Sequence, residues 1–157
     1  MRRGRHHRAG EGWLSHSLRA PDSDVTIEPF HVPRGKGATH NIGIDVTVKA
    51  GEYRSGHGAA VIEFTTRKGE EPGDHAHPTE DEMFYVVRGE LTFECDGKRF
   101  DVETGGFVFL PRGLTHNYTI RTDGAVRLLV ITAPPRAGSE SWGGFVADVE
   151  SADQGHE

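Results

Sequence analysis

The stretch GDHAHPTEDEMFYVVRG, residues 73–89, combines two closely spaced histidines with the alternating pattern of a β-strand. His75 and His77 are two positions apart, and residues i and i+2 of an extended chain point to the same face. Glu82 follows five positions later and shares a face with Phe84 in an alternating apolar row. Two imidazoles and a carboxylate are therefore expected on the inner side of a β-structure.

The regions on both sides of this stretch repeat the alternation of apolar and polar residues that is typical of half-buried strands. Strands are expected at residues 25–32, 42–48, 60–66, 83–88, 91–95, 98–102, 107–110, 115–120 and 126–132. Asp96-Gly97 is a two-residue signal for a type I′ hairpin. Short strands at this spacing predict an all-β sandwich or a small barrel.

Length and composition narrow the class of protein further. A chain of 157 residues favours a single domain. The net charge of −6 argues against a general nucleic-acid binder, which would show a basic face. The single cysteine excludes an internal disulfide framework. The 21 glycines are more than usual and favour many tight turns, and no apolar run approaches the ~18 residues of a membrane-spanning helix.

The two ends of the chain differ in composition from its middle. We expect a disordered basic arm at residues 1–20, a barrel domain at 21–136 and a C-terminal tail at 137–157. The arm lacks the apolar core of a secretory signal, so a cytoplasmic location is expected. A short helix in the tail is predicted from the apolar spacing of Trp142, Phe145 and Val149.

A third histidine follows a turn much later in the chain, where Pro111-Arg112-Gly113-Leu114-Thr115 leads into His116. Three neutral imidazoles and one carboxylate suit one divalent transition-metal ion, such as Fe, Mn, Ni, Co or Zn. The alternative is ordinary placement in the core or on the surface, since a His-x-His pair arises easily by chance among ten histidines. The spacing between the motifs has to decide between these two interpretations.

That spacing resembles the two motifs of the cupin superfamily over about residues 40–133. The first motif runs from Gly69 through the two histidines and Glu82 to Gly89, and the second runs from Gly105 to His116. Ile120 stands where the family often has Asn, which is not a metal ligand. The resemblance implies a cupin-type β-barrel, also called a double-stranded β-helix or jelly roll. It also implies a metal site formed by His75, His77, Glu82 and His116.

The same resemblance helps to predict which neighbouring acidic residue is a ligand and which residues line a pocket. Only Glu82 fits both spacings of the first motif, so Glu80 and Asp81 are expected to be solvated charges at a strand entrance. Because His116 must point inward, Tyr118 is expected to do so too. The candidate substrate-pocket walls are Phe64, Phe84, Phe93, Phe109 and Tyr118. For each of these, plain core packing is the alternative.

Three functions remain open at this point. The two motifs look like those of the small single-domain quercetin-dioxygenase-like group, which implies a dioxygenase acting on a small aromatic or enol-containing metabolite. Glu82 would then be both ligand and catalytic base, and dioxygen the co-substrate. The alternatives are a redox-neutral isomerase, cyclase or lyase, and a non-catalytic small-ligand-binding protein. By analogy with the family, we expect a homodimer in which the strand at 25–32 crosses to the partner.

Overall fold

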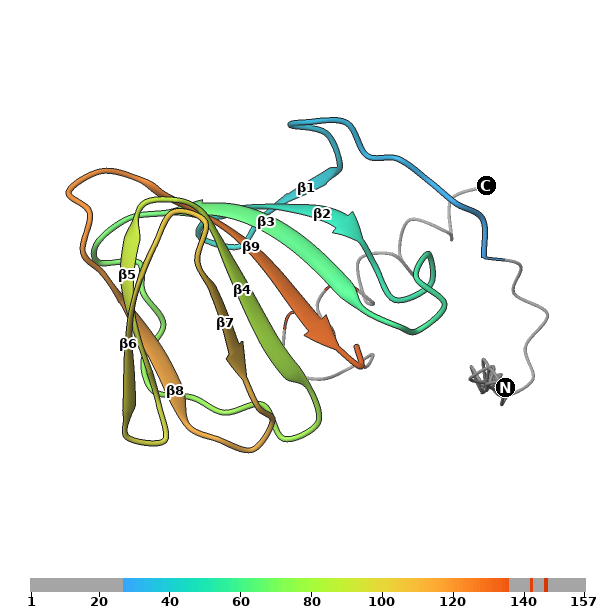
Figure 1. The fold of residues 1–157 in the computed structure, drawn as a ribbon. Coiled ribbons are helices and arrows are strands. Elements are labelled where there is room, and N and C mark those ends of the chain that lie inside the picture. Colours follow the sequence, from blue (N-terminus) through green and yellow to red (C-terminus); the bar gives the residue numbers. More distant parts are fainter. Residues whose placement is uncertain (1–26, 136–141, 143–145, 147–157) are drawn as a thin grey trace, which may run out of the picture.

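The computed structural model describes residues 27–135 together with Trp142 and Val146, and within them the chain forms nine strands in two facing antiparallel sheets (Figure 1). The larger sheet has the order β1 (Ala38–Asn41), β2 (Asp45–Ala50), β3 (Ala60–Thr66), β9 (Val126–Ala133), β4 (Asp81–Arg88), β7 (Phe107–Leu110). The smaller sheet has the order β6 (Lys98–Glu103), β5 (Glu90–Cys95), β8 (His116–Ile120). The predicted all-β barrel is confirmed.

The strand order explains how distant parts of the sequence become neighbours. Strand β9, the last in the chain, lies between β3 and β4 and pairs with both. Strand β8 pairs with β5 in the opposite sheet. The two halves of the chain are therefore interleaved, and the first residues of β4 and β8 come to lie close together.

The core lies between the two sheets and follows the alternation of the sequence. On β4, Phe84 and Val86 are buried, whereas Tyr85 between them is exposed. The Phe93 ring on β5 packs against Phe84 at 5.1 Å and against Tyr118 at 5.7 Å between ring centroids. Fully burying a side chain of this size contributes about 1.5–3 kcal/mol. These three aromatic rings thus join the two sheets at the centre of the barrel.

The β5–β6 hairpin confirms the turn that was predicted from its sequence. Asp96 and Gly97 both have positive φ, +48° and +74°, as a type I′ turn requires. Cys95 pairs with Lys98 across it. The turn chemistry of two residues was sufficient to fix the register of these two strands.

The prediction for the strand at residues 25–32 is wrong over the part that the structure describes, because residues 27–32 form no strand. Pro29 and Pro33 each lack the backbone N–H that a strand ladder needs. Ile27 and Phe30 are 56% and 40% exposed, and the Phe30 ring lies 3.9 Å from the Arg54 guanidinium carbon. Residues 25 and 26 lie outside the described residues.

The predicted strand at 42–48 is found only from Asp45 onward, because residues 42–44 form a turn between β2 and a preceding strand, β1, that was not predicted. Strand β1 ends at Asn41 and β2 begins at Asp45, because Gly43 takes a φ of +99° that reverses the chain. Asn41 and Asp45 close the turn with a side-chain hydrogen bond of 2.8 Å. Ile42, expected inside the strand, is 47% exposed at the tip.

Two residues of the C-terminal tail are described by the structure. Val146 is fully buried and Trp142 is partly buried against the core, so the tail returns to the barrel at these two points. Phe145 and Val149, the other members of the predicted helix, and the predicted arm at 1–20 lie outside the described residues. No helix in the described part of the chain is long and apolar enough to cross a membrane.

Candidate metal centre

The two ligand-bearing segments are joined by their main chains. His75, in the segment before β4, and His116, the first residue of β8, form an isolated antiparallel bridge. The His75 amide donates to the His116 carbonyl at 3.1 Å, and the His116 amide donates back at 2.8 Å. Gly113 also donates its amide to the His77 carbonyl at 2.8 Å. Backbone pairing therefore brings the two sequence motifs together.

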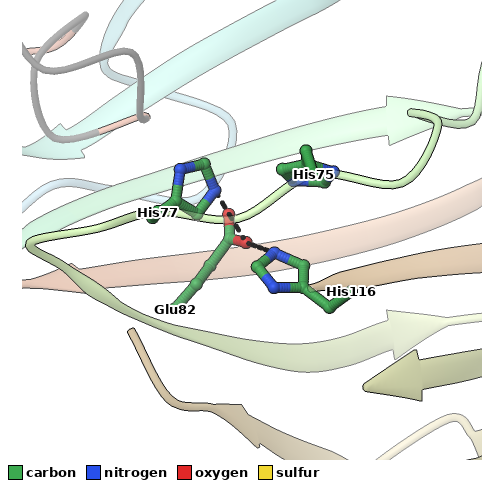
Figure 2. A group of neighbouring side chains, drawn as sticks. All are labelled: His75, His77, Glu82 and His116. Carbon is green, nitrogen blue, oxygen red and sulfur yellow. Dashed lines mark hydrogen bonds and ion pairs between the residues drawn. The ribbon is translucent and has the colours of Figure 1, made fainter. Parts of the chain in front are cut away.

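The four predicted ligands converge on one point at the opening of the barrel (Figure 2). One ligand atom from each of His75, His77, Glu82 and His116 lies within 4.8 Å of all the others. Glu82 Oε2 is 3.2 Å from His116 Nε2 and 3.4 Å from His77 Nε2. Three imidazoles and one carboxylate at this separation match the geometry that one divalent transition-metal ion needs.

Two of the imidazoles are oriented by main-chain carbonyls. The Nδ1–H of His75 donates to the Gly73 carbonyl at 2.8 Å, and that of His116 donates to the Leu114 carbonyl at 2.9 Å. A donor at Nδ1 leaves the Nε2 lone pair of a neutral imidazole available as a ligand. Such outer hydrogen bonds are typical of metal-binding histidines, because they fix the ring orientation and the tautomer.

The site buries polar atoms that lack partners within the described part of the chain. Glu82 and His116 are 1% and 3% exposed, and Glu82 Oε1 and His77 Nε2 have no hydrogen-bond partner there. Leaving buried polar groups unpaired costs free energy, and more so when the group is charged. A cation bound among the four side chains would satisfy both atoms, so the residues present fit a metal ion.

The charges of the site are coupled. Burial alone would raise the pKa of Glu82, but the contacts from His116 and His77 outweigh it and hold that pKa below its ordinary value. Burial alone would lower the pKa of His116, but hydrogen bonds to Glu82 and to the Leu114 carbonyl raise it. Glu82 and the imidazoles thus stabilise each other electrostatically. Metal binding at this site would displace protons from the imidazoles.

A mostly apolar cavity of about 580 Å³ opens beside the four ligands. Of the predicted walls, Phe64, Phe84 and Tyr118 line it. Trp142, from the C-terminal tail, also lines it and packs on Phe64 with ring centroids 5.5 Å apart. Burial raises the pKa of the Tyr118 hydroxyl to about 12. The volume falls within the range of small-molecule sites.

Two predicted walls do not line the cavity. Phe109 is 50% exposed, because Val108 and Leu110 on either side of it are the residues of β7 that point inward. All four residues of this strand are apolar, so alternation could not show which face is buried. Phe93 is fully buried but lies behind Phe84 and Tyr118 in the core.

Sequence reasoning also missed some walls and misplaced two charges. Ile42, Ile44, Leu110 and Trp142 line the cavity but look like ordinary core residues in the sequence. Glu80, expected to be solvated, is only 1% exposed. It is two positions from Glu82, and this spacing in an extended segment was the available signal. Asp81 is not a free solvated charge either, because both of its oxygens accept hydrogen bonds from Arg112.

Comparison with known proteins agrees with this geometry. Residues 62–132 match the family model described as Cupin domain, and the two-sheet barrel is the cupin fold. This region of the chain is therefore similar to the cupin superfamily. An RmlC-like cupin from Shewanella frigidimarina NCIMB 400 superimposes with a TM-score of 0.58 at 21% identity. That match covers 77% of this chain and 100% of the other, and it shows a common fold.

Two curated relatives match shorter stretches. Over 60 residues the chain is 32% identical to quercetin 2,3-dioxygenase of Bacillus subtilis (strain 168), which is 38% of this chain and 18% of that protein. Over 68 residues it is 29% identical to polyketide synthase CurC of Streptomyces cyaneus, which is 43% of this chain and 44% of that protein. The matched stretches thus span less than half the length of either relative.

Proposed function

We propose that this protein is a metal-dependent cupin enzyme, a dioxygenase that acts on a small aromatic or enol-containing metabolite. The observation that carries this proposal is the convergence of three imidazoles and one carboxylate at the wall of an apolar cavity of about 580 Å³. A purely structural metal site would be closed, whereas a catalytic site keeps an open side for substrate. The similarity to quercetin 2,3-dioxygenase supports oxygenation in particular.

The ligands have separable tasks in this proposal. His75, His77, Glu82 and His116 would hold one divalent transition-metal ion, which lowers the pKa of an enol or phenol bound beside it and favours reaction with dioxygen. Glu82 would take the hydroxyl proton of the substrate with the carboxylate oxygen that does not hold the metal. Glu82 is thus proposed as both ligand and catalytic base.

The cavity walls would position the substrate and exclude water. Phe64 and Trp142 form a tilted stack in the cavity wall, and Phe84 also lines the cavity. Aromatic walls of this kind hold a flat ring by burial of apolar surface and by offset or edge contacts. The hydroxyl or enol oxygen of such a ring is then directed toward the polar ligand cluster, where Glu82 is available as the proton acceptor.

A redox-neutral reaction is the second candidate, and the similarity to polyketide synthase CurC favours it. An isomerase, cyclase or lyase would use the same ligands and the same base, but it would consume no dioxygen. A non-catalytic binding protein would hold the ligand without turnover. Turnover and oxygen consumption therefore separate the three candidates.

The test is an oxygen-uptake screen with the protein reconstituted separately with Fe, Mn, Ni, Co or Zn, using flavonols and related enols as substrates. Uptake that matches product formation is the expected result. Turnover under nitrogen would instead establish the redox-neutral reaction, and binding without turnover would establish a binding protein. The absence of uptake with every metal would contradict the dioxygenase proposal.

The Glu82→Gln variant separates the role of Glu82 as catalytic base from its role as metal ligand. The variant should retain part of its metal and lose turnover by at least about 100-fold, the range of general-base catalysis. Asp81→Asn is the matched control, because Asp81 is adjacent but pairs with Arg112 outside the cavity. Unchanged turnover in Glu82→Gln would contradict the role of Glu82 as base.

The homodimer and the cytoplasmic location stay predictions. Size-exclusion chromatography with light scattering would test the homodimer.

A further inference from the structure

Arginine side chains line a second pocket, of about 290 Å³, at the end of β4 that is opposite to the metal centre. Its walls are Arg34, Thr65, Val87, Arg88, Ala125 and Arg127. Glu82 is the second residue of strand β4 and Arg88 is the last, so they are about 20 Å apart along the strand. This pocket is therefore distinct from the candidate metal centre and shares no lining residue with its cavity.

The pairing of the strands places the arginines beside each other. Arg127 on β9 is the direct partner of Arg88 on β4 and of Thr65 on β3. A register shift between Val86 and Arg88 produces the first of these pairings. Neighbouring strands are about 4.8 Å apart, and like charges directly opposite each other destabilise a sheet. The arrangement thus has a cost that a bound anion would relieve.

Few carboxylates neutralise this pocket. Glu63 accepts hydrogen bonds from Arg127, but the same carboxylate also lies 3.7 Å from the Lys49 ammonium. Arg34 and Arg88 form no ion pair within residues 27–135. Among the described residues, at least two guanidinium charges of this pocket therefore lack a counter-ion, although the whole chain carries a net charge of −6.

Three other exposed arginines are paired with carboxylates. Arg99 lies 3.4 Å from Glu94, Arg112 lies 2.7 Å from Asp81, and Arg121 lies 3.8 Å from Glu90. Each of these surface arginines has a carboxylate nearby on its own sheet or the next loop. Arg54 and Arg67 also form no ion pair within the described residues, but they do not line this pocket, whereas the end of β4 brings three arginines together.

We propose that this arginine pocket binds a phosphate group, either as inorganic phosphate or as the phosphate end of a small phosphomonoester. Guanidinium groups bind phosphate oxygens through paired, charge-assisted hydrogen bonds. A phosphomonoester carries about −1.5 to −2 charges at neutral pH, which matches the two uncompensated guanidinium groups. The Thr65 hydroxyl adds a neutral donor. The proposal does not depend on the reaction at the metal centre.

Calorimetric titration of the metal-loaded protein with inorganic phosphate and with glycerol 3-phosphate tests the proposal, with sodium chloride at equal ionic strength as the reference. Arg88→Gln and Arg34→Gln should each weaken binding of both probes at least about tenfold, because each removes a charged hydrogen-bond donor. Arg99→Gln is the matched control, since Arg99 is exposed and lies outside the pocket. It should bind phosphate as the unmodified protein does.

Each outcome decides the proposal or one of its parts. Loss of binding of both probes in the two pocket variants, with retention in Arg99→Gln, supports it. Binding of inorganic phosphate without glycerol 3-phosphate would restrict the ligand to the free anion. Equal phosphate binding in Arg88→Gln, or no binding beyond that of chloride, would overturn the site. Equal or tighter binding of succinate would overturn its assignment to phosphate.

Discussion

The two ends of β4 contain opposite kinds of polar cluster. At its beginning, Glu82, His77 and His116 are buried, His75 beside them is half-buried, and two of the imidazoles are held by main-chain carbonyls. At its end, Arg34 and Arg88 are exposed, Arg127 is half-buried, and all three carry the same charge. Buried polar groups need partners inside the protein, whereas exposed guanidinium groups can remain solvated until an anion arrives. One cluster is therefore preorganised and the other is open.

The same difference decides what could be predicted from sequence. His75, His77 and Glu82 lie within eight consecutive residues, and the spacing of the second motif adds His116, so the sequence alone identified the candidate ligands. Arg34, Arg88 and Arg127 come from three separate segments and have no common spacing. Only the pairing of β4 with β9 brings two of them together, and that register was not predictable from local pattern.

A substitution in the core between the two ends of β4 should change the free energy of unfolding most. Phe93→Ala should lower the free energy of unfolding by about 3–5 kcal/mol, because the ring is fully buried between Phe84 and Tyr118. Chemical denaturation followed by fluorescence measures it. If the two ends depend on one common core, metal binding and phosphate binding will both weaken in this variant. A loss below 1 kcal/mol, as seen for surface substitutions, would contradict the described packing.

The metal end can be removed alone with His116→Ala. Metal affinity should fall at least about 100-fold, which corresponds to about 2.7 kcal/mol. Even mutation of residues that only hydrogen-bond to the ligands lowers metal affinity about 10–100-fold. Competition with a chromogenic chelator measures the affinity. Binding of phosphate at the arginine pocket should be unchanged. A loss of both metal affinity and phosphate affinity in this variant would show that the two clusters are coupled, despite their separation along β4.

The arginine end can be disturbed alone with Gly89→Ala. Gly89 has a φ of +107°, and a Cβ there would lie 2.7 Å from Val126 Cγ2, so the variant should lose about 1–3 kcal/mol of stability. Gly97→Ala is the matched control, because Gly97 also has positive φ but faces open space. Thermal unfolding compares the two. Equal losses would show that backbone strain alone, without the Val126 contact, accounts for the effect.

The smallest effect is expected at the outer face of β7. Phe109→Ala should change the free energy of unfolding by no more than about 0.5 kcal/mol and should leave metal affinity unaltered, because the ring is half exposed. The same denaturation experiment as for Phe93→Ala measures it. A loss approaching that of Phe93→Ala would mean that Phe109 is covered in solution, for instance by a second copy of the chain.

The incorrect predictions share a physical origin. Alternation identifies a buried face only when the two faces differ in polarity, and the Phe107–Leu110 run is apolar on both. At residues 27–32 the alternation was present, but prolines removed the donors that a ladder requires. Glu80 was read by its charge, although its position two residues before Glu82 places it on the inner row. The candidate metal ligands could be predicted because they occur at a fixed spacing, whereas the exposure of single side chains was harder to predict.

The bridge between His75 and His116 has a consequence for how the centre tolerates change. Amides and carbonyls hold the two segments together, so truncating a ring leaves the surrounding walls in place and opens a hole of the shape of the missing heterocycle. Free imidazole added from solution should enter that hole and restore ligation. Loss of a single donor at this centre would then be reversible by a small molecule.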